Sequence, residues 1–192
     1  MPTDLWLNRW IDVISRRTLN PAILELGCGS GRDTAFLAQH GFTRLTVTDL
    51  SADALADCAR IVPAAAAVRH DLRAPLPFPD DSFDVVIASL CLHYFDWKTT
   101  QAIVARIRAC LVDDGVLVCR VNSTKDVNFG AVGHPEIEPH FYDVEGRTKR
   151  FFSREDIDAL FGEGWTRIST EEMEIDRYEK RKVVWEVVVR KG

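Results

Sequence analysis

The strongest signal in this chain is the stretch Ile23-Leu24-Glu25-Leu26-Gly27-Cys28-Gly29-Ser30-Gly31-Arg32-Asp33-Thr34. Its first part is apolar and predicts a buried strand. Three glycines at alternate positions then let the backbone turn tightly and leave it bare of side chains. A helix after the turn directs its free N–H groups back into it. The stretch therefore predicts a strand–turn–helix unit that binds a nucleotide-like ligand.

Two residues argue against a dinucleotide as that ligand. The dinucleotide fingerprint G-x-G-x-x-G requires its third glycine at position 32, where this chain has Arg32. Glu25 stands two residues before the first glycine, and a carboxylate there repels phosphate and attracts a cation. The pattern favours a nucleoside that carries positive charge.

Two acidic residues follow at the ends of later predicted strands. Asp49 closes a strand over 45–49, 22 positions after Gly27, which is close to the spacing at which α/β nucleotide sites place a carboxylate for the ribose hydroxyls. Asp71 comes just after a short strand over 65–69. A helix over 52–61, capped by Ser51, separates the two strands.

With these residues the sequence resembles the class I S-adenosylmethionine-dependent methyltransferases. The segment Pro75-Leu76-Pro77-Phe78-Pro79-Asp80-Asp81-Ser82-Phe83-Asp84 is similar to that of the small, type-11-like members. The resemblance implies a doubly wound, Rossmann-like α/β fold: a mostly parallel sheet of seven strands, the last one antiparallel, with helices on both faces. It also implies S-adenosyl-L-methionine as the cofactor.

The resemblance assigns roles to individual residues. Asp49 takes the ribose, and Asp71 takes the adenine amino group with the backbone of Leu72 beside it. Glu25 favours the ammonium side of the methionine part, which the glycines cradle. The full set of cofactor-binding candidates is Glu25, Gly27, Cys28, Gly29, Gly31, Asp49, Leu50, Asp71, Leu72 and Ser89.

Catalytic candidates follow the fourth predicted strand. Ligands of open parallel sheets bind outside the carboxyl ends of the strands, so His93 and Tyr94 are expected to face the transferred methyl group. His93 would accept a proton from the acceptor; the alternative for both residues is packing against the cofactor. The N-P-P-Y-like motif of enzymes that methylate planar amino groups is replaced by Ala88-Ser89-Leu90-Cys91, which disfavours that substrate class.

Composition points to a small-molecule enzyme of one domain, residues 1–192. Twenty-four basic and 29 acidic residues give a formal net charge of −5, and the basic ones are scattered, which disfavours a nucleic-acid partner. Five cysteines without a C-x-x-C pair, together with no visible signal peptide or membrane span, predict a cytoplasmic protein with reduced thiols. We expect a monomer or homodimer, no membrane partner, and no metal, since His134 and His140 are irregularly spaced.

Two segments lie outside the motif pattern. Residues 4–17, within an N-terminal region over 1–20, are predicted to form a helix capped by Thr3 or Asp4, and its apolar face suits packing on the edge of the core. The resemblance implies that this helix covers the cofactor cleft, where Trp6 or Trp10 would wall the substrate pocket. Residues 122–152 show no regular pattern and are predicted to form a substrate-side loop.

The predicted function is direct in-line methyl transfer from S-adenosylmethionine to a small-molecule acceptor. Three alternatives stay open at this point. The first is a protein or RNA methyltransferase that needs a partner for recognition. The second is a cofactor-binding module without transfer activity, and the third is a nicotinamide enzyme.

Overall fold

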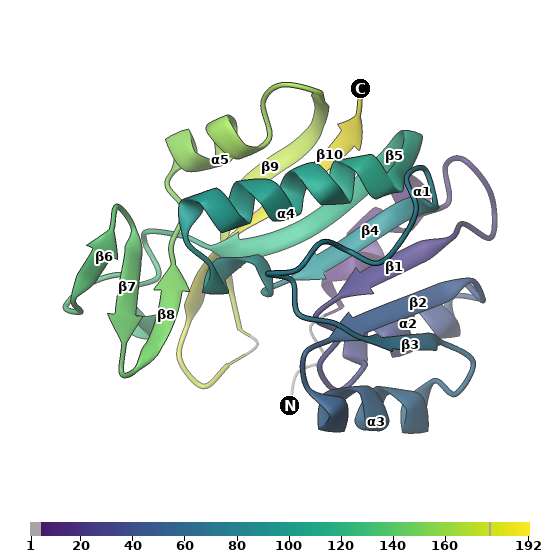
Figure 1. Ribbon diagram of the computed structural model, residues 1–192, viewed down its shortest axis with the longest axis horizontal. Coiled ribbons are helices and arrows are strands. Elements are labelled where there is room, and N and C mark those ends of the chain that lie inside the picture. The colour runs from purple at the N-terminus through teal and green to yellow at the C-terminus, as the bar shows by residue number, and fades with distance from the viewer. Residues whose placement is uncertain (1–4, 177) are drawn as a thin grey trace.

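The computed structural model describes residues 5–176 and 178–192. Its centre is a seven-stranded sheet in the order β3-β2-β1-β4-β5-β10-β9 (Figure 1). Neighbouring strands from β3 to β5 pair in parallel, whereas β10 is antiparallel to both β5 and β9. The predicted fold is therefore confirmed. The strands are β1 (Ile23–Leu26), β2 (Leu45–Asp49), β3 (Ala66–Arg69), β4 (Phe83–Ser89), β5 (Leu111–Asn122), β9 (Trp165–Ile175) and β10 (Lys182–Lys191).

Side chains cap the N-termini of α3, α4 and α5. Ser51 accepts a hydrogen bond from the N–H of Ala54, and Ser153 forms a capping box with Asp156. The α-helices are α1 (Ile11–Ile14), α2 (Arg32–Gln39), α3 (Ala52–Ile61), α4 (Trp97–Cys110) and α5 (Arg154–Leu160), and the 3₁₀ turns are η1 (Trp6–Trp10), η2 (Leu92–Tyr94) and η3 (Val127–Phe129).

The sheet separates two apolar layers, because alternate residues of a strand point to opposite faces. In β4, Val86 belongs to the layer under α4 and α5, whereas Ile87 belongs to the layer under η1, α1 and α2. Figure 1 shows α4 and α5 on one side of the central strands. Since both faces are covered, the ligand site is left to the strand ends.

The N-terminal segment differs from its prediction. Instead of one helix over 4–17, a 3₁₀ turn is followed by a single short helical segment. The indole N–H of Trp6 donates to Asp33 at 3.1 Å and that of Trp10 donates to Glu186 at 2.9 Å. These long-range hydrogen bonds fix the backbone near the two tryptophans, although the spacing of the apolar residues suits one continuous helix. The predicted caps, Thr3 and Asp4, lie outside the described residues.

Residues 122–152 also differ from the predicted irregular loop. They contain η3 and a three-stranded antiparallel sheet of β6 (Glu136–Glu138), β7 (Phe141–Val144) and β8 (Arg147–Arg150), which stands to one side of the main sheet (Figure 1). Glu145 and Gly146 join β7 to β8, with φ angles of +55° and +79°. Two positive φ angles in a two-residue connection define a tight hairpin turn, so this segment is ordered by its own backbone pairing.

β9 continues to Ile175, and each of its last five residues pairs with β10. Within the ranges that the structure describes, none of the helices is long and apolar enough to cross a membrane.

Candidate functional site

The glycine turn after β1 has three glycines in the left-handed region, each with a different environment. A Cβ on Gly27 would lie 2.6 Å from Cβ of Cys91, and one on Gly31 would lie 2.7 Å from Sγ of Cys58. A Cβ on Gly29 would meet no atom within 4 Å. Gly27 and Gly31 therefore allow the turn to pack on its neighbours, whereas Gly29 leaves open space beside the backbone.

Asp49, at the end of β2, ties the turn to the neighbouring strand. One carboxylate oxygen accepts the N–H of Gly29 at 2.9 Å, and the other accepts the N–H of Ser51 at 2.9 Å. Each oxygen keeps a second lone pair for a ligand. The carboxylate is thus held in place beside the glycine turn.

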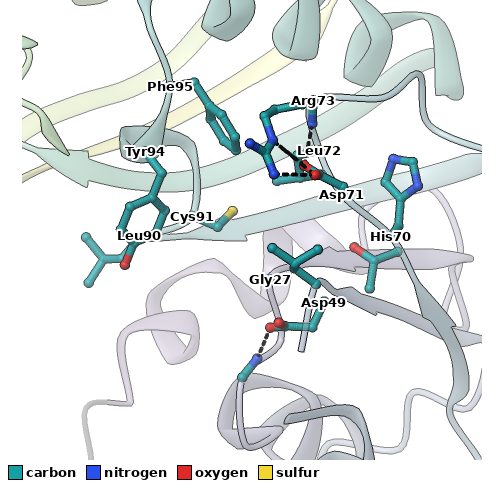
Figure 2. A pocket seen from close by; sticks show the side chains of 13 residues that line it. Gly27, Asp49, His70, Asp71, Leu72, Arg73, Leu90, Cys91, Tyr94 and Phe95 are labelled. Carbon is teal, nitrogen blue, oxygen red and sulfur yellow. Dashed lines mark hydrogen bonds and ion pairs between the residues drawn. The ribbon is translucent and has the colours of Figure 1, made fainter. Parts of the chain in front are cut away.

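A cavity of about 510 Å³ opens at the carboxyl ends of β1, β2, β3 and β4 (Figure 2). This is the edge at which open α/β sheets bind ligands, and its volume lies in the usual range for small-molecule sites. Its lining residues are Gly27, Gly29, Thr48, Asp49, Leu50, His70, Asp71, Leu72, Arg73, Leu90, Cys91, Tyr94 and Phe95.

The structure brings seven of the twelve predicted site residues into this first cavity. They come from four separate segments of the sequence, so the fold alone assembles them. They are Gly27, Gly29, Asp49, Leu50, Asp71, Leu72 and Tyr94.

Asp71 has a partner that the sequence motifs did not indicate. Arg73 donates from Nε to both oxygens of Asp71 at 3.0 Å and from its terminal nitrogen at 2.6 Å, and its backbone N–H adds a bond of 3.0 Å. These bonds lower the pKa of Asp71. Figure 2 shows the guanidinium of Arg73 on the Asp71 carboxylate beside Leu72, so the carboxylate is ionised and oriented.

Other lining residues missed by motif reading come directly after β4. Leu90 has a φ of +56°, a conformation that costs energy in a residue with a side chain and that gathers at functional sites. Cys91 is buried, and burial raises the pKa of its thiol. Leu90 and Cys91 could have been predicted from their position directly after a central strand. Only His93 and Tyr94 were predicted from that position.

Four predicted cofactor residues lie outside the first cavity. Glu25 is buried in β1 and accepts a hydrogen bond from the hydroxyl of Thr34 at 2.5 Å. Cys28 packs with Val47, Leu55 and Cys58 behind the turn, where burial raises its pKa. The others are Gly31, described above, and Ser89, whose hydroxyl oxygen is buried without a hydrogen-bond partner among the described residues.

His93 lines a second cavity of about 470 Å³, which shares Leu90 and Tyr94 with the first. Its ring lies 4.2 Å from that of Tyr94, centre to centre. Burial lowers the pKa of His93 to about 3, and the charges of Lys182 and Lys149 act in the same direction. The imidazole is therefore neutral at neutral pH.

Neither Trp6 nor Trp10 lines either cavity. Both are buried in the layer that also contains Phe36, and the guanidinium of Arg120 lies 4.5 Å from the Trp6 ring centre. The part of the N-terminal segment that the structure describes packs on the sheet face in place of the predicted pocket wall.

Comparison with known proteins gives a consistent result. A family model described as "methyltransferase domain" matches residues 23–115. An uncharacterized methyltransferase of Synechocystis is 35% identical over 94 residues, which are 49% of this chain and 43% of that protein. The chain thus spans less than half the length of that relative.

Solved structures match over nearly the whole chain. An S-adenosylmethionine-dependent methyltransferase of Methanosarcina mazei has a TM-score of 0.76 at 17% identity, with 90% of this chain and 92% of the other covered. One from Mesorhizobium loti has a TM-score of 0.73 at 23% identity, covering 90% and 91%. A 1,6-didemethyltoxoflavin-N1-methyltransferase of Burkholderia thailandensis, solved with its substrate and S-adenosylhomocysteine, has a TM-score of 0.70 at 21% identity, covering 98% and 81%. At these identities the likeness establishes the fold.

Proposed function

We propose that the chain is a class I S-adenosylmethionine-dependent methyltransferase that transfers a methyl group to a small-molecule acceptor. The methyltransferase-domain match over residues 23–115 and the shared fold support this family and S-adenosylmethionine as its cofactor. The observation that carries the proposal is the junction of two cavities at Leu90 and Tyr94. One cavity has the features of a nucleoside site, and the other is large enough for a separate small molecule.

The residues of the first cavity fit the cofactor. Gly29 leaves the backbone bare where the methionine part is expected, because a Cβ there meets nothing. Asp49 presents acceptor oxygens for two ribose hydroxyls, and Asp71 does so for the adenine amino group. Leu50, Leu72 and Phe95 supply apolar walls for the base.

Catalysis in this arrangement depends mainly on positioning. When bound, S-adenosylmethionine supplies an electrophilic methyl group on a sulfonium. The residues between the two cavities have to align the acceptor and exclude water, and such alignment contributes on the order of 7–11 kcal/mol in favourable cases. Tyr94 lines both cavities and His93 the second, so these two residues are the ones proposed to orient the acceptor.

We propose further that the protein is cytoplasmic and that its methyl acceptor is not a nucleic acid. All five cysteines are free and buried, as expected in a reducing compartment. The formal charge of −5 supports a small acceptor over a nucleic acid.

A screen with labelled methyl donor tests the function directly. Thiols, amines, phenols and chalcogen anions are offered to the protein, with total protein and total RNA as separate acceptors. Label on a small molecule supports the proposal. Label on macromolecules alone supports the partner-dependent alternative, and no transfer at all leaves a binding module. Tighter binding of NADH than of S-adenosylhomocysteine would point to a nicotinamide enzyme.

Replacing Asp49 with alanine is expected to weaken S-adenosylhomocysteine binding at least tenfold, about 1.4 kcal/mol. The variant removes the two acceptor oxygens that face the cavity beside Gly29. Calorimetric titration measures the effect. Asp53→Ala is the matched control, because Asp53 is exposed in the first turn of α3 and does not line the cavity. Equal affinities for Asp49→Ala and the wild type would rule out the ribose assignment.

Replacing His93 with alanine is expected to slow turnover more than it weakens cofactor binding, because His93 lines only the second cavity. Since its ring stays neutral, wild type and variant should have pH profiles of the same shape between about pH 5 and 8. Steady-state kinetics and calorimetry measure the two effects. His40→Ala, remote from both cavities, serves as the control. Equal losses in turnover and affinity would make His93 a packing residue.

A further inference from the structure

The second cavity is built from segments that are far apart in the sequence. Leu90 and His93 follow β4, and Asn122 ends β5. The rest comes from η3, the β7–β8 hairpin, Tyr178 between β9 and β10, and the start of β10. The small sheet formed by β6, β7 and β8 thus contributes one wall of the proposed acceptor site. The lining residues are Leu90, His93, Tyr94, Asn122, Phe129, Val144, Glu145, Arg147, Lys149, Tyr178 and Lys182.

The lining has more positive than negative side chains, although the chain as a whole is acidic. Lys182 is neutralised by Asp126 at 2.7 Å, and both side chains are buried. Among the described residues, neither Arg147 nor Lys149 forms an ion pair with a carboxylate; the Lys149 ammonium donates to the carbonyl of Phe129 at 3.2 Å. Against one acidic residue, Glu145, two cations therefore remain available to a ligand.

Two residues of the lining also carry buried polar atoms that lack protein partners. The side-chain oxygen of Asn122 and Nδ1 of His93 have no hydrogen bond within the described ranges 5–176 and 178–192. Asn122 is 1% exposed and His93 is 5% exposed. Leaving such groups unpaired costs on the order of 1–3 kcal/mol each, so a ligand that supplies the missing hydrogen bonds gains affinity. The oxygen of Asn122 requires a donor, either O–H or N–H.

Aromatic rings form a further part of the lining. Phe129 and Tyr178 lie 5.4 Å apart, centre to centre, and the Lys182 ammonium lies 4.6 Å from the Phe129 ring centre. Tyr94 adds a third ring at the boundary with the first cavity. Flat apolar surfaces of this kind suit a planar molecule.

We infer that the second cavity binds a small aromatic acid as the methyl acceptor. Its carboxylate pairs with Arg147 and Lys149, its ring lies among Phe129, Tyr178 and Tyr94, and an O–H or N–H group donates to Asn122. The inference rests on the proposed function for the identity of this molecule as the acceptor. The charge pattern and the unpartnered atoms stand independently of it.

The test is a binding measurement on protein saturated with S-adenosylhomocysteine. The probes are the three hydroxybenzoates and the three aminobenzoates, each beside its uncharged primary amide. Calorimetry or ligand-observed NMR is expected to show at least one acid binding at least fivefold more tightly than its amide, about 1 kcal/mol. The double variant Arg147→Gln/Lys149→Gln should bring this ratio close to one and leave S-adenosylhomocysteine affinity unchanged.

The control double variant is Arg60→Gln/Lys98→Gln, which removes the same charge from exposed positions outside the cavity and should keep the preference for the acid. The inference is overturned if no acid binds at millimolar concentration, if every amide binds as well as its acid, or if the preference survives in Arg147→Gln/Lys149→Gln. Failure of the inference about the aromatic acid is distinct from failure of the proposed function, because cofactor affinity is measured separately. Failure of the proposed function would appear as absence of S-adenosylhomocysteine binding or of methyl transfer.

Discussion

Replacing Gly31 with alanine is expected to destabilise the protein by about 2–5 kcal/mol, from backbone strain and overpacking together. Gly31 has a φ of +81°, and an added Cβ would lie 2.8 Å from Cα of Cys58 in α3. A backbone atom inside a helix cannot move aside as a flexible side chain can. Urea denaturation followed by circular dichroism measures the loss.

Gly29→Ala is the matched control in the same turn. Gly29 also has a positive φ, +53°, but a Cβ there meets no atom within 4 Å, so only the strain of about 1–2 kcal/mol applies. Equal losses for the two variants would show that the approach of α3 to the turn does not explain the glycine at position 31.

Replacing Glu186 with alanine is expected to cost about 3–5 kcal/mol of folding free energy, the range for breaking a buried ion pair. The Glu186 carboxylate is fully buried in β10 and accepts from Nε of Arg120 at 2.8 Å. It also accepts from the indole of Trp10 at 2.9 Å and from Arg9 at 3.2 Å. Its removal leaves the buried Arg120 charge without this carboxylate.

Glu171→Ala provides the comparison, because Glu171 also pairs with Arg9 but both side chains are 47% exposed. Exposed pairs of this kind contribute at most about 1 kcal/mol. Denaturant midpoints and slopes for the two variants decide the question. A loss in Glu186→Ala no larger than that in Glu171→Ala would contradict the role given to the buried pair.

Local signals were sufficient for most of the main sheet. The glycine spacing around Gly27 and the acid at Asp49 each depend on residues close together in the chain, so they can be recognised without knowing the fold. The prediction of one N-terminal helix was wrong because the indoles of Trp6 and Trp10 donate hydrogen bonds to Asp33 and Glu186. No local sequence pattern identifies these partners. The small sheet was missed although the tight turn at Glu145-Gly146 offered a local signal for its hairpin.

The candidate site divides in the same way. The motif residues that line the first cavity were predicted, but the pairing of Arg73 with Asp71 depends on side-chain geometry and was not. Glu25 and Cys28 belong to the motif, yet neither lines the first cavity. Glu25 is buried in β1, whose two faces are both covered, and Cys28 packs with Val47, Leu55 and Cys58.

The amino-acid sequence by itself determined the strand–turn–helix unit and the order of the main strands along the chain, since these follow from local backbone preferences and short-range spacing. Only the tertiary structure decided that Leu90 and Tyr94 separate two cavities and that the second one gathers Asn122, Arg147 and Lys149. The reason is physical: the proposed donor site is built from turns that directly follow strands β1 to β4, whereas the proposed acceptor site exists only once β5, β10 and the small sheet have packed together.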